Sequence, residues 1–162
     1  MNNNIGIILD DSVDDEIFRR WASDGQIEKA WLALLTILGI KSLITAPLCI
    51  RFASNSIVRQ LNHEWRNKDA VTDVLSFPMQ DGPDFSPEQP LGDIVLAIPF
   101  VHDAAKTLAL SVEHHTLHLI VHGMLHLLAY DHQDDEEAIV MQALESTCLQ
   151  QLGLENPYLN NV

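Results

Sequence analysis

Residues 113–132 read EHHTLHLIVHGMLHLLAYDH, and this stretch holds six of the eight histidines of the 162-residue chain. From Leu117 to Leu128 the predicted helix is apolar nearly all the way round, which is typical of a helix buried within a protein. Ser111, just before the stretch, is a common N-cap residue, and Glu113 suits the first helical turn. The sequence therefore predicts a buried, histidine-rich helix inside the fold.

Hydrophobic periodicity and the positions of glycine and proline predict the elements around this helix. Strands are expected over 5–9, 47–53, 73–77 and 92–98, and helices over 14–21, 26–38, 54–65, 99–109 and 134–152. Because strand runs come early and helices late, we expect an α+β fold with a small mixed β-sheet of about four strands packed by helices. With 47% hydrophobic residues, the chain suits a single domain over 1–162.

Acidic residues dominate the chain, since 23 Asp and Glu against 9 Lys and Arg give a formal net charge of −14. This excess excludes bulk attraction to nucleic acid. The span 51–68 is the exception, with a local balance of +3 from Arg51, Arg59, Arg66 and Lys68 against Glu64. We expect an anionic substrate to meet the protein in this span.

The cysteine content and the hydropathy bear on the cell compartment. Cys49 and Cys148 form no Cys-x-x-Cys pair, which favours a reduced, cytoplasmic protein. The first residues lack the basic and apolar runs of a signal peptide, and nowhere do about 18 apolar residues follow one another. We therefore expect a cytoplasmic protein with no membrane partner.

Three histidines have the spacing of a metal site. His122 and His126 stand one helical turn apart on one face of the predicted helix, and His132 follows six residues later, beyond a turn. Three imidazoles with an open fourth position are what a catalytic zinc ion needs, although copper, nickel and iron also accept imidazole. The alternative is a pair of hydrogen-bonded core histidines, which the third histidine makes the weaker interpretation.

The same spacing occurs in the metzincin peptidases, where a glutamate after the first histidine acts as general base. Here that position is Gly123, which cannot accept a proton. Metal-bound water, with its pKa lowered to about 7, would then have to supply the hydroxide itself. Peptide hydrolysis is therefore the weaker alternative for this site.

Four segments of the chain resemble the YbeY family of bacterial endoribonucleases. VHGMLHLLAYDH, residues 121–132, matches the H-G-x-L-H-L-x-G-Y-D-H signature of that family at every fixed position but one. LNHEWRNKDAVTDVLSFP, residues 61–78, is similar to its L-N-x-x-Y-R-x-K-D-x-x-T-D-V-L-S-F-P segment, and LGDI and ENPY also fit. The resemblance runs from about residue 47 to the end and implies an α+β fold with its metal site on a buried C-terminal helix and the turn after it.

The resemblance implies a zinc-dependent, single-strand-specific endoribonuclease that acts in 3′-end maturation of small-subunit ribosomal RNA and in ribosome quality control. Its partners would be single-stranded RNA and the ribosome or small-subunit proteins. His122, His126 and His132 take the metal-ligand positions, for one zinc ion per chain. Arg66 takes the position of the arginine at the catalytic cleft, where a guanidinium can hold a phosphate through two hydrogen bonds, and Lys68 is expected to assist it.

Two other interpretations of the same residues stay open. The metal could staple the C-terminal helices of a ribosome-assembly binding module that has little catalysis of its own, because zinc contributes folding energy directly in such sites. Alternatively, the chain could be a metzincin-like zinc hydrolase of another substrate. Arg66 by itself could also be a surface arginine at a helix end.

Four further residues around these motifs carry smaller expectations. Ala129 stands where the family has a glycine, at a turn where a left-handed alanine costs on the order of 1 kcal/mol. His118 is interpreted as an ordinary helix histidine rather than a contact of the metal ligands, and Trp65 as a core residue rather than a base-stacking one. Asp131 is expected either to orient a ligand imidazole or to cap the next helix.

Overall fold

The computed structural model describes residues 4–11, 13, 19 and 24–158. In this part of the chain four strands form one mixed sheet in the order β1-β2-β4-β3. β1 (Ile5–Leu9), β2 (Leu48–Ala53) and β4 (Gly92–Ala97) run parallel, and the edge strand β3 (Val74–Pro78) runs antiparallel to β4. The expected α+β class and four-stranded mixed sheet are therefore confirmed.

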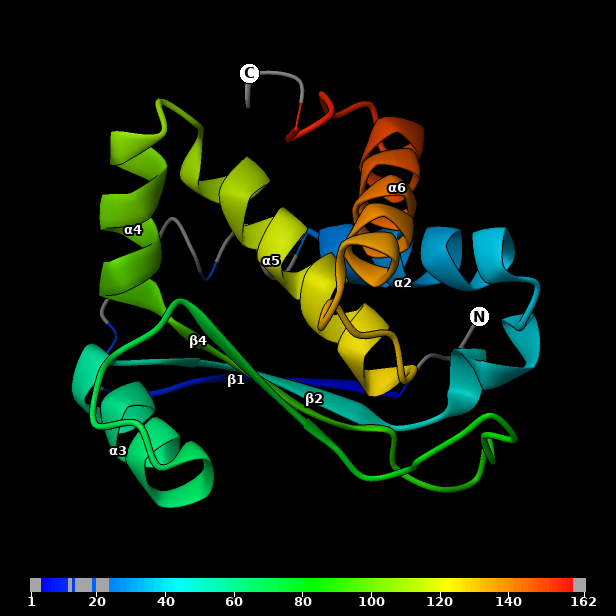
Figure 1. Ribbon diagram of the computed structural model, residues 1–162, viewed down its shortest axis with the longest axis horizontal. Coiled ribbons are helices and arrows are strands. Elements are labelled where there is room, and N and C mark those ends of the chain that lie inside the picture. The colour runs from blue at the N-terminus through cyan, green and yellow to red at the C-terminus, as the bar shows by residue number, and fades with distance from the viewer. Residues whose placement is uncertain (1–3, 12, 14–18, 20–23, 159–162) are drawn as a thin grey trace.

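Helices cover the two faces of the sheet unequally. Figure 1 shows α2 (Gln26–Leu38), α5 (Val112–Leu127) and α6 (Asp135–Gln151) on one side, with α4 (Ile98–Thr107) beside α5. On the other side lies α3 (Asn55–Arg66), at one end of the sheet. None of the helices in the described part of the chain is long and apolar enough to cross a bilayer.

The alternation of side chains along the strands gives the sheet two apolar faces. Ile50 and Ile94 point toward α2, α5 and α6 and are buried there with Ile120 in the main core. Val95 and Leu75 point the other way and form a smaller cluster with residues of α3. The main core therefore lies between the sheet and the predicted histidine-rich helix, as the apolar stretch from 117 to 128 indicated.

Local sequence signals explain where the helices begin. Ser54, Ser111 and Asp134 each stand just before a helix and accept a hydrogen bond from a backbone N–H of its first turn. Pro99 lies in the first turn of α4, where its missing N–H costs nothing. That helix begins at Ile98, so the last residue of the expected strand over 92–98 belongs to α4 instead.

Two expectations for the first part of the chain have different outcomes. The helix expected over 14–21 lies outside the described residues except for Arg19. A 3-10 helix, η1 (Lys41–Thr45), occupies a stretch for which the sequence indicated no element. Helices this short carry little periodicity, so the hydrophobic pattern does not detect them.

α5 approaches the sheet closely at two glycines. A Cβ atom on Gly123 of α5 would lie 3.0 Å from Ile94 Cγ2 and 3.1 Å from Ser76 Oγ. A Cβ atom on Gly92 would collide with the carbonyl oxygen of Phe77 and with the Leu127 side chain, and Gly92 has a φ of 144°. The absence of side chains at these positions lets the helix pack directly on β3 and β4.

Replacing Gly92 by alanine should destabilise the protein markedly. The change forces a side chain into backbone at a φ that only glycine adopts readily and into space already filled by Phe77 and Leu127. We expect Gly92→Ala to lower the free energy of unfolding by roughly 2–4 kcal/mol, measured by denaturant unfolding. Gly153→Ala, at a positive φ but with open space around it, should cost clearly less; equal losses would contradict the close-approach argument.

Candidate metal centre

α5 and the turn after it bring three imidazoles to one point. The Nε2 atoms of His122 and His126 are 3.1 Å apart, and His132 offers a ring nitrogen within 4.8 Å of both. Ligands about 2.0–2.1 Å from a tetrahedral zinc ion lie slightly more than 3 Å apart, so the donor set fits such an ion. In the described part of the chain the expected histidine cluster could therefore hold a metal.

The turn that returns His132 to the helix is built on Ala129. Its φ of 71° is left-handed, its N–H donates to the His126 carbonyl, and the next N–H, from Tyr130, donates to the Leu125 carbonyl. This pair of bonds is a Schellman motif, in which glycine is the usual left-handed residue. The sequence-based expectation of a left-handed residue at 129 is thus confirmed.

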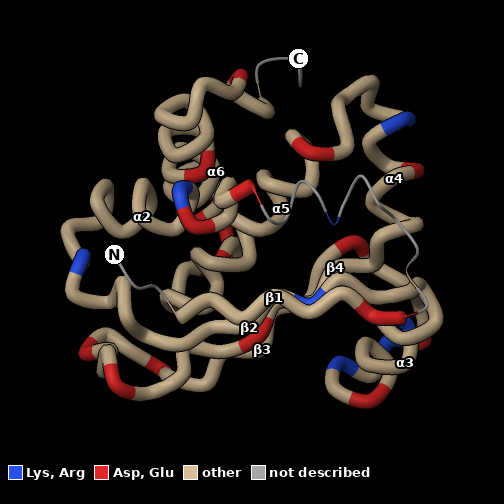
Figure 2. Tube along the Cα trace, turned by 180° about the vertical axis from the view of Figure 1, so that it is seen from behind, with Lys and Arg blue, Asp and Glu red and all other residues tan. Residues whose placement is uncertain are grey.

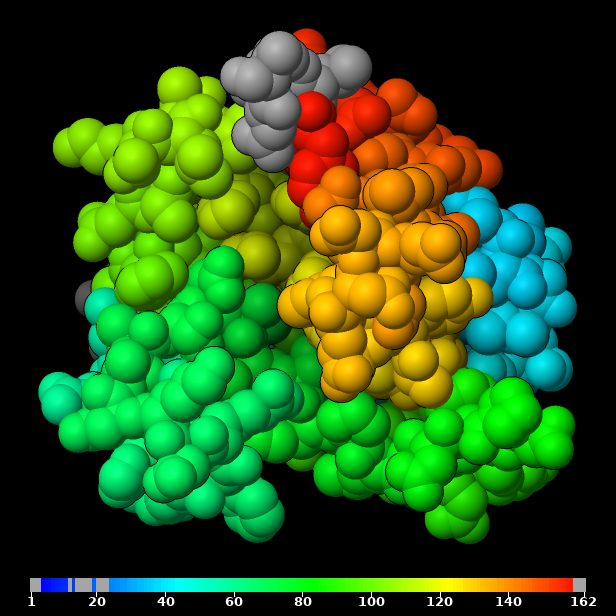
Figure 3. Space-filling view, in the orientation of Figure 1, coloured from blue at the N-terminus to red at the C-terminus, as the bar shows by residue number. Residues whose placement is uncertain are grey.

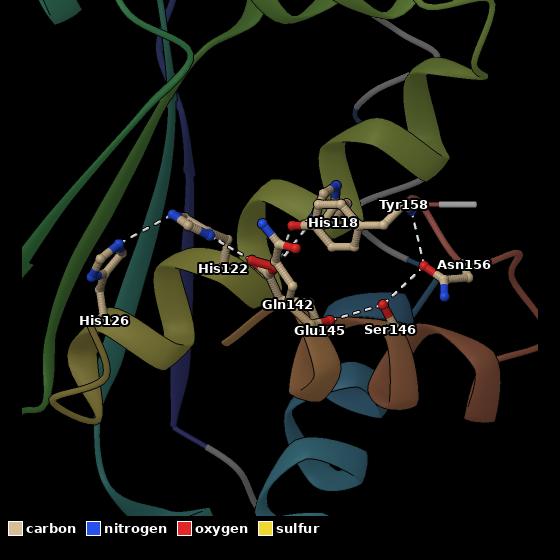
Figure 4. Close-up of polar contacts among 8 residues, drawn as sticks. All are labelled: His118, His122, His126, Gln142, Glu145, Ser146, Asn156 and Tyr158. Carbon is tan, nitrogen blue, oxygen red and sulfur yellow. Dashed lines mark hydrogen bonds and ion pairs between the residues drawn. The ribbon is translucent and has the colours of Figure 1, made fainter. Parts of the chain in front are cut away.

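The buried carboxylate of Glu145 contacts His122 on the side of the ring away from the other two histidines (Figure 4). His122 Nδ1 lies 2.5 Å from Glu145 Oε1, and the Tyr158 hydroxyl donates to Glu145 Oε2 over 2.5 Å. His118 Nε2 lies 3.0 Å from that hydroxyl. Because the carboxylate accepts the proton of Nδ1, the lone pair of His122 Nε2 faces the other two histidines, which is the tautomer that a metal requires.

Charges within this network favour a metal-binding state. Burial raises the pKa of Glu145, but hydrogen bonds from His118, His122 and Tyr158 outweigh it and hold the pKa at about 2. Burial and the neighbouring His122 and His132 lower the pKa of His126, against smaller opposing effects of the Asp131 charge and of a hydrogen bond to the Tyr130 backbone. A neutral imidazole is the form that binds metals, so no proton has to be displaced from His126 at neutral pH.

Beside the histidines lies a cavity of about 470 Å³, and Arg66 forms part of its wall. The Arg66 Nη2 atom donates to the Ser76 carbonyl over 2.7 Å, and the guanidinium lies 5.9 Å from the Phe77 ring centroid. No carboxylate pairs with Arg66 in the described part of the chain. The two carboxylates that also line the cavity, Asp73 and Asp131, accept the backbone N–H groups of Val74 and His132 instead.

The other basic side chains of the span 51–68 contribute less to this site. Arg51 pairs with Asp10 and Arg59 with Asp69, each over 2.8 Å, so their charges are compensated locally. Lys68 is exposed and is not part of the cavity wall. Figure 2 shows the basic positions of this span on β2 and around α3. By contrast, the charged positions on α5 and α6 are all Asp or Glu. The structure thus brings Arg66 to the histidines and leaves Lys68 outside.

Sequence reasoning missed two residues of the site and misjudged others. Glu145 and Tyr158 were given no role, and His118 was interpreted as an ordinary helix histidine although it contacts both of them. The spacing of Glu145 in α6 carries no signal of a role, and its full burial, which is unusual for an acidic residue, is visible only in the structure. Asp131 does neither of the things expected: its carboxylate accepts the His132 N–H, and Asp134 caps α6.

The fold and the donor set together define an α+β protein with a candidate three-histidine metal site. Residues 15–153 match the sequence model of the family described as Endoribonuclease YbeY. Endoribonuclease YbeY of Pseudomonas savastanoi is 41% identical over 146 residues, which cover 90% of this chain and 80% of the relative. The same enzyme of Dichelobacter nodosus is 44% identical over 132 residues, 79% and 81% of the two chains. The chain belongs to the YbeY family.

The family match also corrects one expectation about its extent. It begins at residue 15, well upstream of the start near residue 47 that the resemblance had implied. Among solved structures, the solution structure of TM1509 from Thermotoga maritima has the same fold, with a TM-score of 0.57. The two proteins are 19% identical, and the match covers 92% of this chain and 91% of the other.

Replacing Glu145 by glutamine should weaken metal binding. The amide keeps the size of the side chain but removes the negative charge. That charge orients His122 and raises the basicity of the His122 imidazole. We expect Glu145→Gln to lower zinc affinity by roughly 10- to 100-fold, measured by competition with a chromophoric chelator. Glu155→Gln, an exposed change in the C-terminal segment, is the matched control. An unchanged affinity in folded Glu145→Gln protein would show that Glu145 does not orient the ligand.

Replacing Ala129 by glycine should relieve the left-handed backbone of the turn. Part of the gain is lost to the greater freedom of glycine in the unfolded chain, so we expect about 0.5–1 kcal/mol of added stability. Ala109, with a φ of 55° after α4, has the same pair of backbone bonds far from the histidines and provides the control. Both variants should raise the melting temperature, but only Ala129→Gly should increase the zinc affinity. Equal zinc affinities of the two variants would show that the turn at residue 129 does not strain the metal site.

Proposed function

We propose that this chain is a metal-dependent endoribonuclease that cleaves single-stranded RNA, with one zinc ion held by His122, His126 and His132. The observation that carries the proposal is the shared cavity, in which three metal-type imidazoles stand beside an arginine that forms no ion pair with a carboxylate among the described residues. The relatives named Endoribonuclease YbeY support the same reaction class. We propose further that residues 1–162 act as one domain.

The residues of the chain divide the chemistry between them. A zinc ion at the three histidines would supply a water of lowered pKa or polarise a phosphoryl oxygen. Arg66 holds the scissile phosphate next to that point: one of its five N–H donors is fixed on the Ser76 carbonyl, which orients the others toward the cavity. A planar guanidinium opposes charge that develops on two phosphoryl oxygens at once. Lys68 adds long-range attraction at most, because it lies outside the cavity wall.

The substrate and setting follow from the family and the charge of the chain. We propose that the RNA is the 3′ region of small-subunit ribosomal RNA and that cleavage serves its maturation and ribosome quality control in the cytoplasm. With a net charge of −14, the chain binds bare RNA weakly. Contacts with the ribosome or small-subunit proteins would then provide most of the targeting.

The packing of α5 argues against peptide hydrolysis. Gly123 occupies the position of the metzincin general base, and its missing side chain would point at Ile94 and Ser76 of the sheet. A glutamate at this position could not reach a metal-bound water without displacing the helix. The peptidase alternative therefore lacks both the residue and the space for it.

The number of protein ligands argues against a purely structural metal. Among the described residues, the metal-type cluster contains three histidines and no fourth cysteine, histidine or carboxylate. Structural zinc sites are closed by four protein ligands, whereas catalytic ones keep a position for water. The three-ligand site opens onto a cavity, which supports a catalytic metal rather than a structural metal in a binding module.

The test is cleavage of a single-stranded RNA fragment from the 3′ end of small-subunit ribosomal RNA, with metal content measured by mass spectrometry. We expect one zinc per chain and cleavage that stops on chelation and returns with zinc. His126→Ala should abolish cleavage and metal binding. Arg66→Lys should keep the metal but lower kcat by roughly 100-fold or more, as expected for losing a preorganised donor pair.

Two matched controls separate the site from general surface changes. His63→Ala and Arg59→Lys alter the same residue types on α3, and neither residue belongs to the cavity wall beside the histidines. Both variants should cleave RNA at the wild-type rate. Zinc bound at full occupancy without cleavage would favour the binding module, and cleavage by folded His126→Ala protein would refute the assignment.

A further inference from the structure

Trp65 is the residue whose position departs most from the sequence-based expectation. The sequence indicated a core tryptophan, but 70% of its surface is exposed at the end of α3. Ile8 and Met79 are also exposed, at 49% and 57%. All three line one cavity of about 780 Å³ on the face of the sheet opposite to α5. Figure 3 shows the surface hollowed between α3 and the segment that follows β3.

This second cavity adjoins the metal-site cavity across the edge strand β3. Arg66, Ser76 and Pro78 belong to the walls of both cavities, so the edge strand β3 separates them at that point. The Arg66 guanidinium stands at the junction, 5.9 Å from the Phe77 ring centroid. A strand whose phosphate is held by Arg66 therefore places an adjacent base at this cavity.

The chemistry of the second cavity suits a base better than a backbone phosphate. Trp65 and Phe77 form an edge-to-face pair with ring centroids 6.4 Å apart and supply aromatic surface next to a cation. Proteins that bind single strands without sequence preference use this combination. At the far end, Asp93 lines the wall and Asp10 compensates Arg51, so a second phosphate would be repelled there. A neutral, flat base would not be repelled by these carboxylates.

We propose that this cavity is a base-binding subsite, in which a nucleobase beside the cleaved phosphodiester stacks on the exposed Trp65 ring, with the edge-to-face Phe77 ring as the wall beside it. The proposal rests on the proposed endoribonuclease function and adds a reason why the substrate must be single-stranded. A base inside a duplex is already stacked and paired, and it cannot enter a cavity on the opposite face of β3. Paired RNA is thereby excluded by the walls of the site.

The test uses the full-length protein and fluorescently labelled single-stranded RNA of about 12 nucleotides, a length within the range of single-strand binding sites. Binding is measured by anisotropy with chelator present, and kcat and KM are measured separately with zinc. We expect Trp65→Ala to weaken binding and raise KM by roughly 5- to 150-fold, the range for one base–aromatic stack. Trp65→Tyr keeps a ring and should stay near wild type. Ile139→Ala, an exposed apolar change on α6 that lines neither cavity, should have no effect.

A second arm locates the base itself. RNAs that lack the base at one position, stepped across the cleavage point, should show one position where removal weakens wild-type binding as much as Trp65→Ala does. At that position Trp65→Ala should cause no further loss, because the stacked pair is already broken. Additive losses at every position would overturn the subsite.

The outcomes separate this proposal from the function on which it rests. Cleavage that is equally efficient in Trp65→Ala and Ile139→Ala would overturn the subsite while leaving the endoribonuclease intact, and would leave the exposed face to a protein partner. Trp65-dependent binding without cleavage would support the subsite and refute the enzyme. Absence of RNA binding in the wild type would refute both.

Discussion

The close approach of α5 to the sheet is the constraint on which the rest of the site depends. Gly123 leaves no room for a side chain between the helix and Ile94 and Ser76, so the helix axis lies directly on β3 and β4. This contact fixes how far His122 and His126 stand from the sheet edge. Ser76 lies in the same contact, and its carbonyl accepts the hydrogen bond of Arg66. One packing contact therefore sets the distance between the three-histidine cluster and Arg66.

A second constraint is electrostatic and holds the helices together. Glu145 is fully buried in α6, where an unpaired carboxylate would be very costly. Donors from α5 and from Tyr158 near the C-terminus satisfy it, and burial with this hydrogen bond raises the pKa of Tyr158. The same carboxylate orients His122. Stability of the helical layer and geometry of the metal site thus rely on one charged group.

The edge strand β3 gives the site its two-sided character. Its helix-facing side belongs to the histidine cavity and its other side to the aromatic cavity, with Arg66 at the junction. In the proposed function, this position would let one arginine act on the phosphate while the Trp65 ring next to it acts on a base. The proposed arrangement would also explain how an acidic chain binds an anionic substrate, because one arginine and a neutral stacking surface take the place of a broad basic patch.

The sequence by itself indicated the three histidines of the candidate metal site, the order of the four strands and of α2 to α6, and the left-handed turn. These depend on local spacing: two histidines one helical turn apart, and a third just beyond a turn whose backbone bonds stay within a few residues. Only the tertiary structure decided that Glu145, Tyr158 and His118 support the ligands, that Lys68 stays outside, and that Trp65 is exposed. Apolar periodicity says which face of a helix avoids water, but whether a neighbour covers that face depends on contacts between segments far apart in the chain. Among the described residues, no further element packs over Trp65 on this face of the sheet, so its ring stays exposed.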